Sequence, residues 1–170
     1  GDPGNDMPAV MMCLNASYHA AGKSGERRIA ARDFYQGAYF TALEPGEIVT
    51  AIRIPAPAAG HGYAYEKLKR KVGDYATAAA AVVLTMSGGK VTSSSIGLTN
   101  VAETPLWAEE AARILTGSGL DPATVKRAVA AAEAITSPAT DNRGPAHYRT
   151  KMAGVMLARA LARAKARARG

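Results

Sequence analysis

The residues best suited to chemistry lie together near the middle of the chain. Four cations, a carboxylate and an aromatic ring fall within nine residues: Lys67, Lys69, Arg70, Lys71, Asp74 and Tyr75. A lysine on a strand, followed by a turn with a carboxylate and an aromatic face, suits a planar anionic ligand. A solvated edge strand, protected from aggregation by its lysines, explains the same residues without a ligand. Both interpretations stay open at this point.

Other patterns of catalytic residues are scarce. The sequence has no Gly-x-Ser-x-Gly elbow and no complete phosphate-binding loop, and Gly22-Lys23-Ser24 is typical of a hairpin turn. Cys13 is the one cysteine, which excludes a disulfide framework, and we expect a small buried side chain there. The three histidines are far apart, and we expect them at the surface or in loops. We therefore predict no catalytic residue and no metal site in this chain.

The net charge of +7 comes from one segment. Residues 149–169 contain basic side chains and no acidic one. A nucleic-acid-binding module is one explanation, but alanines rather than stacking aromatics separate the arginines, so we favour a subunit-contact or solubilising face and expect no nucleic acid.

No apolar run reaches the roughly 18 residues of a membrane span, and residues 1–9 do not resemble a signal peptide. We expect no transmembrane segment and a cytoplasmic location.

The elements that position these residues fall into two groups. Residues 2–15 predict a turn and a short helix capped by Asp6. Residues 16–21 and 26–31 predict a hairpin around a four-residue loop. Residues 47–54 alternate as a strand, with Ile48 and Ile52 on one face and Val49 on the other. The prolines and glycines of residues 55–62 predict a boundary between subdomains.

The second group reads as a sheet followed by helices. We expect a strand at residues 63–71 and a hairpin of residues 76–86 and 91–100, although alanine favours helix in the first of these. Thr104-Pro105 predicts a helix start with Trp107 on its apolar stripe, and Asp121-Pro122 predicts another. A last helix from Pro145 should bury Tyr148 and leave its arginines outside. The fold class is α+β, an antiparallel sheet with C-terminal helices on one face.

Five segments, in order along the whole chain, resemble one protein family. They read DPGNDMP at 2–8, ALEPGEIVTAIRIP at 42–55, GYAYEKLKRKVGDYATAAAAVVL at 62–84, IGLTNVAETPLWAEEA at 96–111 and YRTKMAGVMLARAL at 148–161. In these motifs the chain resembles the flavoprotein, or medium, subunit of the molybdenum hydroxylases, and within them the medium chain of aerobic carbon monoxide dehydrogenase.

The resemblance implies an FAD-binding electron-transfer subunit of an oxidoreductase complex. In this family, electrons leave the molybdenum cofactor of a large subunit, cross the 2Fe–2S clusters of a small subunit and reach the FAD, which passes them to an external acceptor. The family's two glycine-rich FAD loops would precede the first motif, so an N-terminal FAD-binding portion would be missing here. Residues 1–57 would end the FAD-binding α/β domain, and residues 58–170 would form the C-terminal domain.

The resemblance also implies cofactor-binding residues, position by position. They are Asp6, Val49, Lys67, Asp74 and Tyr75. Asp6 would hydrogen-bond the FAD on its ribityl or sugar side, and Val49 would pack against the flavin. Lys67 would place a cation near the isoalloxazine, and Tyr75 would lie beside the ring with Asp74 next to it. A flavin subunit of an aldehyde or N-heterocycle hydroxylase fits the same motifs, and a position at the inner face of the membrane, through the complex, stays open.

Overall fold

The computed structural model describes residues 1–169, and its first element is the short helix α1, Asp6–Cys13. Asn5 caps this helix, because its Oδ1 accepts a hydrogen bond from the Met7 N–H at 2.9 Å. The prediction of a helix here is confirmed. The prediction that Asp6 is the cap is wrong, because Asp6 lies inside the first turn and its carboxylate binds Tyr65 and Lys67.

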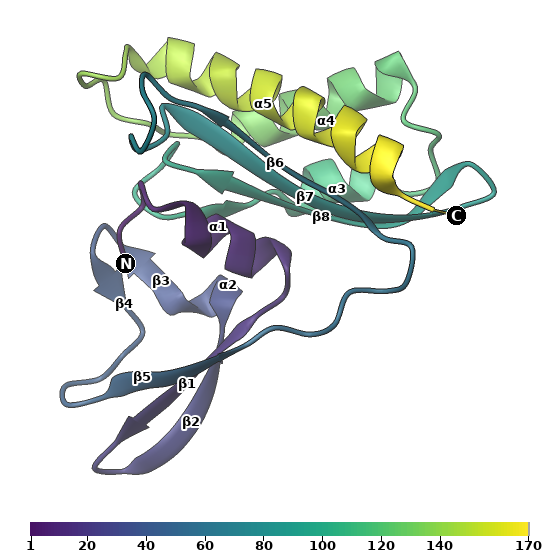
Figure 1. The fold of residues 1–170 in the computed structure, drawn as a ribbon. Helices are drawn as coiled ribbons and strands as arrows, with labels where there is room; N and C mark the ends of the chain where they lie inside the picture. Colours follow the sequence, from purple (N-terminus) through teal and green to yellow (C-terminus); the bar gives the residue numbers. More distant parts are fainter. Residues whose placement is uncertain (170) are drawn as a thin grey trace.

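The lower lobe in Figure 1 contains α1 and a three-stranded antiparallel sheet in the order β2-β1-β5. The strands are β1, Ser17–Gly22, β2, Gly25–Ala30, and β5, Ile48–Arg53. The connection between β2 and β5 contains α2, Ala31–Phe34, and a small hairpin of β3, Tyr35–Gly37, and β4, Phe40–Thr41. The predicted first hairpin is confirmed with a tighter turn, since Gly22 pairs with Gly25 and leaves only Lys23 and Ser24 between the strands.

The upper lobe contains a four-stranded antiparallel sheet in the order β6-β7-β8-β9. Its strands are β6, Gly62–Leu68, β7, Ala78–Ser87, β8, Lys90–Thr99, and β9, Leu106–Trp107. Three helices cover one face of this sheet, as Figure 1 shows: α3, Glu109–Leu115, α4, Pro122–Ala134, and α5, Ala146–Arg167. The α+β class and the helices on one face are confirmed.

Helix α1 lies on the other face of the upper sheet, between the two lobes (Figure 1). The close approach needs small residues: a Cβ at Gly97 of β8 would overlap the Ala9 carbonyl of α1. The Cys13 thiol donates a hydrogen bond to the Ser95 carbonyl at 3.2 Å, and burial raises the pKa of this thiol to about 11. The alanines of β7 are therefore strand residues between two packed layers, and the predicted hairpin of β7 and β8 is confirmed.

Three predictions about the upper lobe are wrong. Strand β6 ends at Leu68, so the basic residues after it lie in a turn. Thr104-Pro105 does not start a helix, since Trp107 belongs to β9 and packs under the Arg32 guanidinium, 3.4 Å from the ring centroid. On α5, Tyr148 is 40% exposed whereas Arg149 is buried at 3%. An arginine is expected outside unless partners replace its water, and Arg149 has such partners.

Candidate functional site

Two of the predicted cofactor residues, Asp6 and Lys67, form an ion pair across the two lobes. The Lys67 Nζ lies 2.8 Å from the Asp6 Oδ2, and the side chains are 18% and 38% exposed. Helix α1 supplies the carboxylate, and β6 supplies the ammonium from the sheet face that α1 covers. The pair joins residues that are 61 positions apart. Since a carboxylate can accept several hydrogen bonds, Asp6 keeps acceptor capacity on its exposed side.

Tyr65, two residues before Lys67 on the same strand face, completes this polar cluster. Its hydroxyl donates to the Asp6 Oδ1 at 2.8 Å and lies 3.2 Å from the Thr99 Oγ1. Burial raises the pKa of the Tyr65 hydroxyl, and the neighbouring Asp6 carboxylate raises it further. The hydroxyl therefore stays a donor, and it fixes Asp6 from a second direction.

The predicted residue Tyr75 lies in the turn between β6 and β7, with its ring 48% exposed. Gly4 backs the ring: a Cβ there would lie 3.2 Å from the Tyr75 Cδ1. Asp2, through its charge and a hydrogen bond, raises the pKa of the Tyr75 hydroxyl. The Arg143 guanidinium lies 5.9 Å from the ring centroid. The exposed aromatic face could stack against a flat ligand.

Asp74, the other residue predicted in this turn, faces a different partner. Its Oδ2 accepts from the Arg70 Nε at 3.1 Å, and this hydrogen bond lowers the pKa of the Asp74 carboxyl. The side chain is 11% exposed. Asp74 therefore shapes the turn that carries Tyr75, and no contact of its own joins it to Asp6 in the described part of the chain.

Val49 reaches the same region from the lower lobe because β5 contains a bulge. His19 pairs with Ala51 but Ala20 pairs with Val49, so Thr50 is an extra residue in the strand. The predicted strict alternation of β5 is wrong for this reason: Val49 and Ile52 line the same cavity, of about 320 Å³, together with Met7 and Asp2. Val49 is 39% exposed.

The predicted residues are thus arranged around the start of α1, which we call the 2–7 segment. Asp6 binds Lys67, Gly4 backs Tyr75, and Asp2 and Met7 share a cavity with Val49. Among the predicted residues, Asp6 and Lys67 are the two that an ion pair joins across the fold. Asp2, Gly4, Tyr65 and Arg143 were not predicted from the sequence, although the turn residues Asp2-Pro3-Gly4-Asn5 are a signal that points to the first two.

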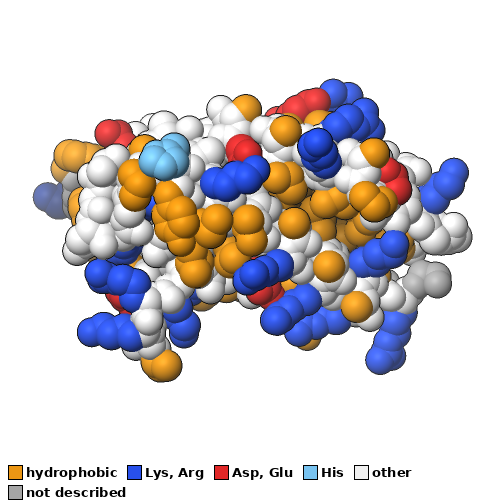
Figure 2. Space-filling model, turned by 90° about the horizontal axis from the view of Figure 1, so that it is seen from above, with side chains coloured by type: hydrophobic (Ala, Val, Ile, Leu, Met, Phe, Trp, Pro, Cys, Tyr) orange, Lys and Arg blue, Asp and Glu red, His pale blue; other side chains and the backbone are white. Residues whose placement is uncertain are grey.

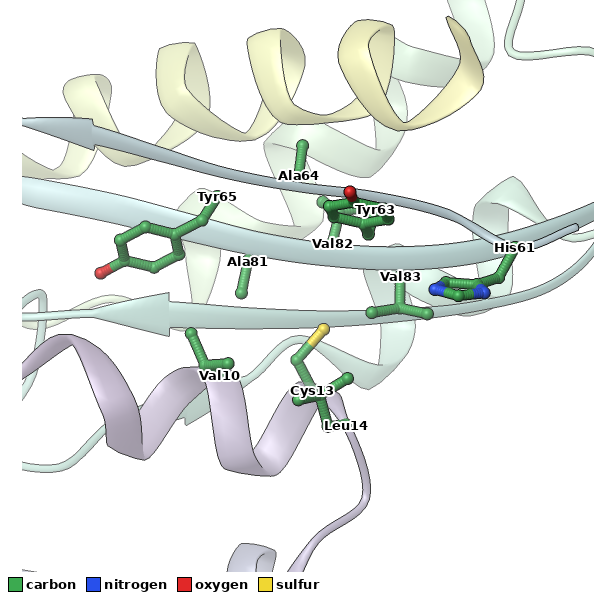
Figure 3. Close-up of a pocket in the computed structure, with 10 residues that line it drawn as sticks. All are labelled: Val10, Cys13, Leu14, His61, Tyr63, Ala64, Tyr65, Ala81, Val82 and Val83. Carbon is green, nitrogen blue, oxygen red and sulfur yellow. The ribbon is translucent and has the colours of Figure 1, made fainter. Parts of the chain in front are cut away.

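A second cavity, which was not predicted from the sequence, lies between the end of α1 and the strands β6 and β7 (Figure 3). Its volume is about 260 Å³, and apolar or aromatic side chains line most of it, among them Val10, Cys13, Tyr63 and Val83. Figure 3 shows the Tyr65 ring turned away from His61 and Tyr63, toward the other end of α1. With so few polar groups, this cavity suits an apolar group rather than a phosphate.

No group of histidine, cysteine, aspartate or glutamate residues within residues 1–169 is arranged to hold a metal ion. Over the same residues, none of the helices has the length and apolarity needed to cross a membrane.

Comparison with known proteins identifies similar sequences over nearly the whole chain. Residues 63–164 match the CO dehydrogenase flavoprotein C-terminal domain, and residues 1–57 match the FAD binding domain in molybdopterin dehydrogenase. The carbon monoxide dehydrogenase medium chain of Afipia carboxidovorans is 73% identical over 99% of this chain and 59% of its own length. That of Hydrogenophaga pseudoflava is 48% identical over 98% of this chain and 58% of its own length.

A solved structure agrees with these relatives. The crystal structure of the Cu,Mo-CO dehydrogenase in its cyanide-inactivated form superposes with a TM-score of 0.98 at 73% identity, covering 99% of this chain and 59% of that chain. The chain therefore spans less than two thirds of the length of the curated relatives it matches.

Proposed function

Because the chain belongs to the CO dehydrogenase flavoprotein family, we propose that it is the FAD-binding, electron-transferring part of the medium subunit of a carbon monoxide dehydrogenase-like molybdenum hydroxylase. The observation that carries this proposal is the high identity to a carbon monoxide dehydrogenase medium chain over both lobes. The FAD would take electrons from the 2Fe–2S clusters of a small subunit and pass them to an external acceptor. The oxidation of carbon monoxide would take place in a large molybdenum subunit.

The chemistry of the 2–7 segment and its neighbours fits part of an FAD molecule. Tyr75 offers an exposed aromatic face, and the missing side chain at Gly4 lets the backbone of the 2–7 segment pack closely against this ring. Pockets for small molecules and cofactors have volumes of about 300–1,000 Å³. The cavity beside Val49, at about 320 Å³, is at the lower end of this range and suits one portion of the cofactor.

Each predicted residue has a role in this proposal. Asp6, held by Lys67 and Tyr65, would accept a hydrogen bond from a hydroxyl on the ribityl or sugar side. Lys67 would keep positive charge near the isoalloxazine, where a cation favours the reduced, anionic form. Tyr75 would lie beside the ring on a turn that Asp74 shapes, and Val49 would supply apolar surface. FAD, when bound, supplies the redox chemistry.

We propose the same division of the chain as before, with residues 1–57 in the FAD-binding domain and residues 58–170 in the C-terminal domain. The ranges of the two family matches support it, as does the exposed connection of residues 54–59. The remainder of the FAD-binding domain would come from an N-terminal portion of the same subunit. The complex would work in the cytoplasm, and a position at the inner face of the membrane, through the complex, stays open.

The visible spectrum of the purified complex tests the proposal. We expect flavin absorbance in the full medium subunit together with its large and small partners, and bleaching of that absorbance when carbon monoxide is added under anaerobic conditions. A complex without flavin absorbance contradicts FAD binding. Flavin that stays oxidised with carbon monoxide, but bleaches with an aldehyde or an N-heterocycle, assigns the chain to another molybdenum hydroxylase.

The alternative of a nucleic-acid-binding module is disfavoured by the contacts of the basic helix α5. Arg163 pairs with Glu66 at 2.8 Å, Lys151 pairs with Glu133 at 3.3 Å, and Arg167 donates to the Tyr63 carbonyl at 2.8 Å. Figure 2 shows that Lys and Arg side chains on the helical face are scattered among hydrophobic and acidic ones. Nucleic acid needs a continuous basic track, whereas these side chains stabilise the packing of α5.

A further inference from the structure

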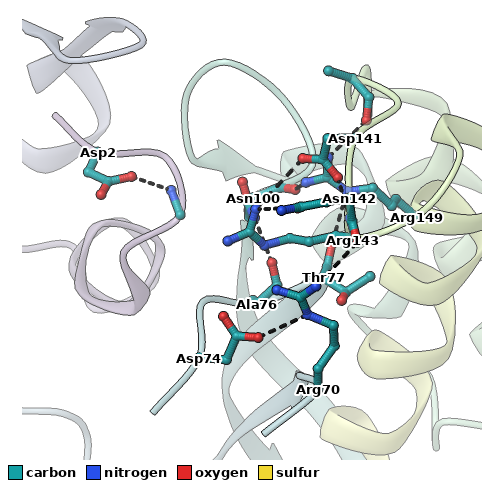
Figure 4. A network of polar contacts seen from close by, with 12 residues as sticks. Asp2, Arg70, Asp74, Ala76, Thr77, Asn100, Asp141, Asn142, Arg143 and Arg149 are labelled. Carbon is teal, nitrogen blue, oxygen red and sulfur yellow. Dashed lines mark hydrogen bonds and ion pairs between the residues drawn. The ribbon is translucent and has the colours of Figure 1, made fainter.

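The buried side chain of Arg149, near the start of α5, forms hydrogen bonds with three separate segments of the chain (Figure 4). Its Nε donates to the Thr77 carbonyl at 3.2 Å, its Nη1 donates to the Ala139 carbonyl at 2.9 Å, and its Nη2 donates to the Asn100 carbonyl. The Asp141 carboxylate lies 3.0 Å from the Nη1. Because the side chain is only 4% exposed, the charge depends on these partners in place of water.

Asn100, directly after β8, extends the network to the 2–7 segment. Its φ of 59° is in the left-handed region, which asparagine adopts more readily than most residues. The Asn100 N–H donates to the Pro3 carbonyl at 3.1 Å, and its side-chain Nδ2 donates to the Ala76 carbonyl at 2.5 Å. Asn100 therefore connects the segment behind Tyr75 to the residue that follows Tyr75.

The loop that Arg149 holds through Asp141 returns to the turn of Tyr75. Figure 4 shows Arg143 and Asn142 of this loop beside the turn of Arg70 and Asp74. The Arg143 guanidinium lies near the Tyr75 ring, and the Arg70 Nη1 lies 3.4 Å from the Asn142 carbonyl. The turn is thus held from both sides, while the Arg149 side chain itself is buried.

A purely structural role for Arg149 would not require this pattern. Well-packed apolar side chains of similar volume often replace buried ion pairs at little or no cost in stability. The three carbonyls that Arg149 binds lie in connections, after β6, after β8 and after α4, and an aliphatic side chain could not fix their positions. The guanidinium group therefore fixes the conformation of these three connections.

We propose that Asn100 and Arg149 are positioning residues that hold the Tyr75 turn against residues 2–4 and so set where the Tyr75 ring meets the cofactor. This inference rests on the proposed FAD function, which it deepens by naming residues outside the cofactor contacts. Asn100 acts through the Ala76 carbonyl, and Arg149 acts through Thr77 and through Asn100.

The variant Asn100→Gly tests the inference in the full medium subunit. Glycine keeps the left-handed backbone and both main-chain hydrogen bonds, so only the contact with Ala76 is lost. We expect hydrogen exchange of the amides of residues 69–77 to become about three- to tenfold faster, the effect of one hydrogen bond. The matched control is Asn15→Gly, which makes the same change at a second left-handed asparagine, an exposed one, and should leave these amides unchanged.

FAD affinity provides the second measurement. We expect Asn100→Gly and Tyr75→Ala each to weaken FAD binding, and the double variant to bind no more weakly than Tyr75→Ala alone, because both changes remove the same interaction. Arg149→Lys should weaken FAD binding more than Asn100→Gly does, since one ammonium cannot reach three carbonyls. Arg159→Met, on the exposed face of α5, should bind FAD normally.

The outcomes separate this inference from the proposed function. Unchanged exchange in Asn100→Gly overturns the positioning role, whether or not FAD binds. A second outcome is faster exchange in Asn100→Gly together with losses of FAD affinity that add up in the double variant. The turn would then be looser without acting through Tyr75, and this result also overturns the positioning role. If exchange is faster in Asn100→Gly than in the wild type, but the wild-type subunit takes up no FAD, the proposed function is contradicted instead.

Discussion

At the scale of single residues, the pairing of Asp6 with Lys67 decides what a ligand would meet. The two charges compensate each other at 2.8 Å, so a cofactor at this place meets an oriented carboxylate next to a fixed ammonium, not an isolated cation. Tyr65 adds a donor that burial keeps protonated. Such preorganised groups stabilise charge without having to reorient.

A double-mutant cycle measures this pair. We expect Asp6→Asn and Lys67→Met each to lower the free energy of unfolding by about 1 kcal/mol, and the double variant to lose less than their sum, because the pair is partly shielded. Urea unfolding of all four proteins gives the coupling energy. The same cycle on Glu110 and Arg113, whose side chains are 53% and 73% exposed, should give a smaller coupling. Strict additivity at Asp6 and Lys67 would contradict the ion pair.

The types of these residues could be predicted from the sequence, but their partners could not. The sequence singled out Asp6 and Lys67, yet they are 61 positions apart and no local pattern predicts that they meet. The prediction that Arg149 lies outside followed from the cost of burying a charge, which is correct for an isolated arginine. The carbonyls that offset this cost belong to connections as far as 72 residues away.

At the scale of elements, local signals were sufficient where turn chemistry is strong. The Gly88-Gly89 turn identified the hairpin of β7 and β8 against alanine's helical preference, and Asp121 caps α4 as expected, accepting from the Thr124 N–H at 3.0 Å. The bulge of β5 could not be found this way, since the extra residue is defined only by the pairing with β1. The prediction of a helix start at Thr104-Pro105 was wrong because β9 lies between this dipeptide and α3.

The packing of α1 against β8 gives a prediction for Gly97. We expect Gly97→Ala to lower the free energy of unfolding by about 1–3 kcal/mol, since the new Cβ would overlap the Ala9 carbonyl and push α1 off the sheet. Thermal or urea unfolding measures the change. Gly119→Ala is the control, because the nearest atom to its new Cβ would be the Gly89 carbonyl oxygen at 3.4 Å. If both variants unfolded alike, the tight contact would not exist.

The attachment of β5 to the first hairpin predicts a pH effect at Glu47. Its Oε1 and Oε2 both lie 2.7 Å from Arg27 nitrogens, and Oε2 also accepts from the Glu44 N–H. These hydrogen bonds, mainly with Arg27, lower the pKa of the Glu47 carboxyl from 4.5 to about 2. Since the folded-state pKa is lowered, the stabilisation is complete above pH 4.5 and is lost as the pH falls toward about 2.

The comparison of Glu47→Gln with the wild type tests this effect. We expect the variant to be less stable by a constant amount from pH 7 to 4.5, and the difference to shrink below pH 4.5 and to vanish near pH 2. Urea midpoints across this range provide the measurement. Glu103→Gln, at an exposed position, serves as the control for the loss of one carboxylate. A difference that grew on acidification would have the wrong sign for a lowered pKa.

At the scale of the whole molecule, helix α1 makes the two lobes depend on each other. By sequence it belongs to the part that matches an FAD binding domain, but it packs on the sheet of the part that matches the C-terminal domain. The α+β class and the helical layer could be predicted from the order of strands and helices. This shared helix could not, because periodicity identifies an apolar face but not the surface that covers it.

The same arrangement predicts how residues 1–170 behave alone with FAD. They supply one wall of the proposed site, so we expect FAD to bind at least about 100-fold more weakly than to the full medium subunit, as when the contacts of a cofactor's phosphates are lost. Fluorescence titration of both proteins with FAD measures the ratio. Tight one-to-one binding by residues 1–170 would show that these residues form a complete site.

The contact of α1 with β8 also has a consequence for synthesis on the ribosome. The hydrogen bond of Cys13 with Ser95 can form only after another 82 residues have been synthesised. At about 5–20 residues per second, this interval lasts roughly 4–16 s. During that time the side of α1 that packs on β8, with the buried Ala9 and Cys13, lacks the strand that covers it in the finished protein. The nascent chain therefore presents a short hydrophobic helix to chaperones well before its partner strand has been made.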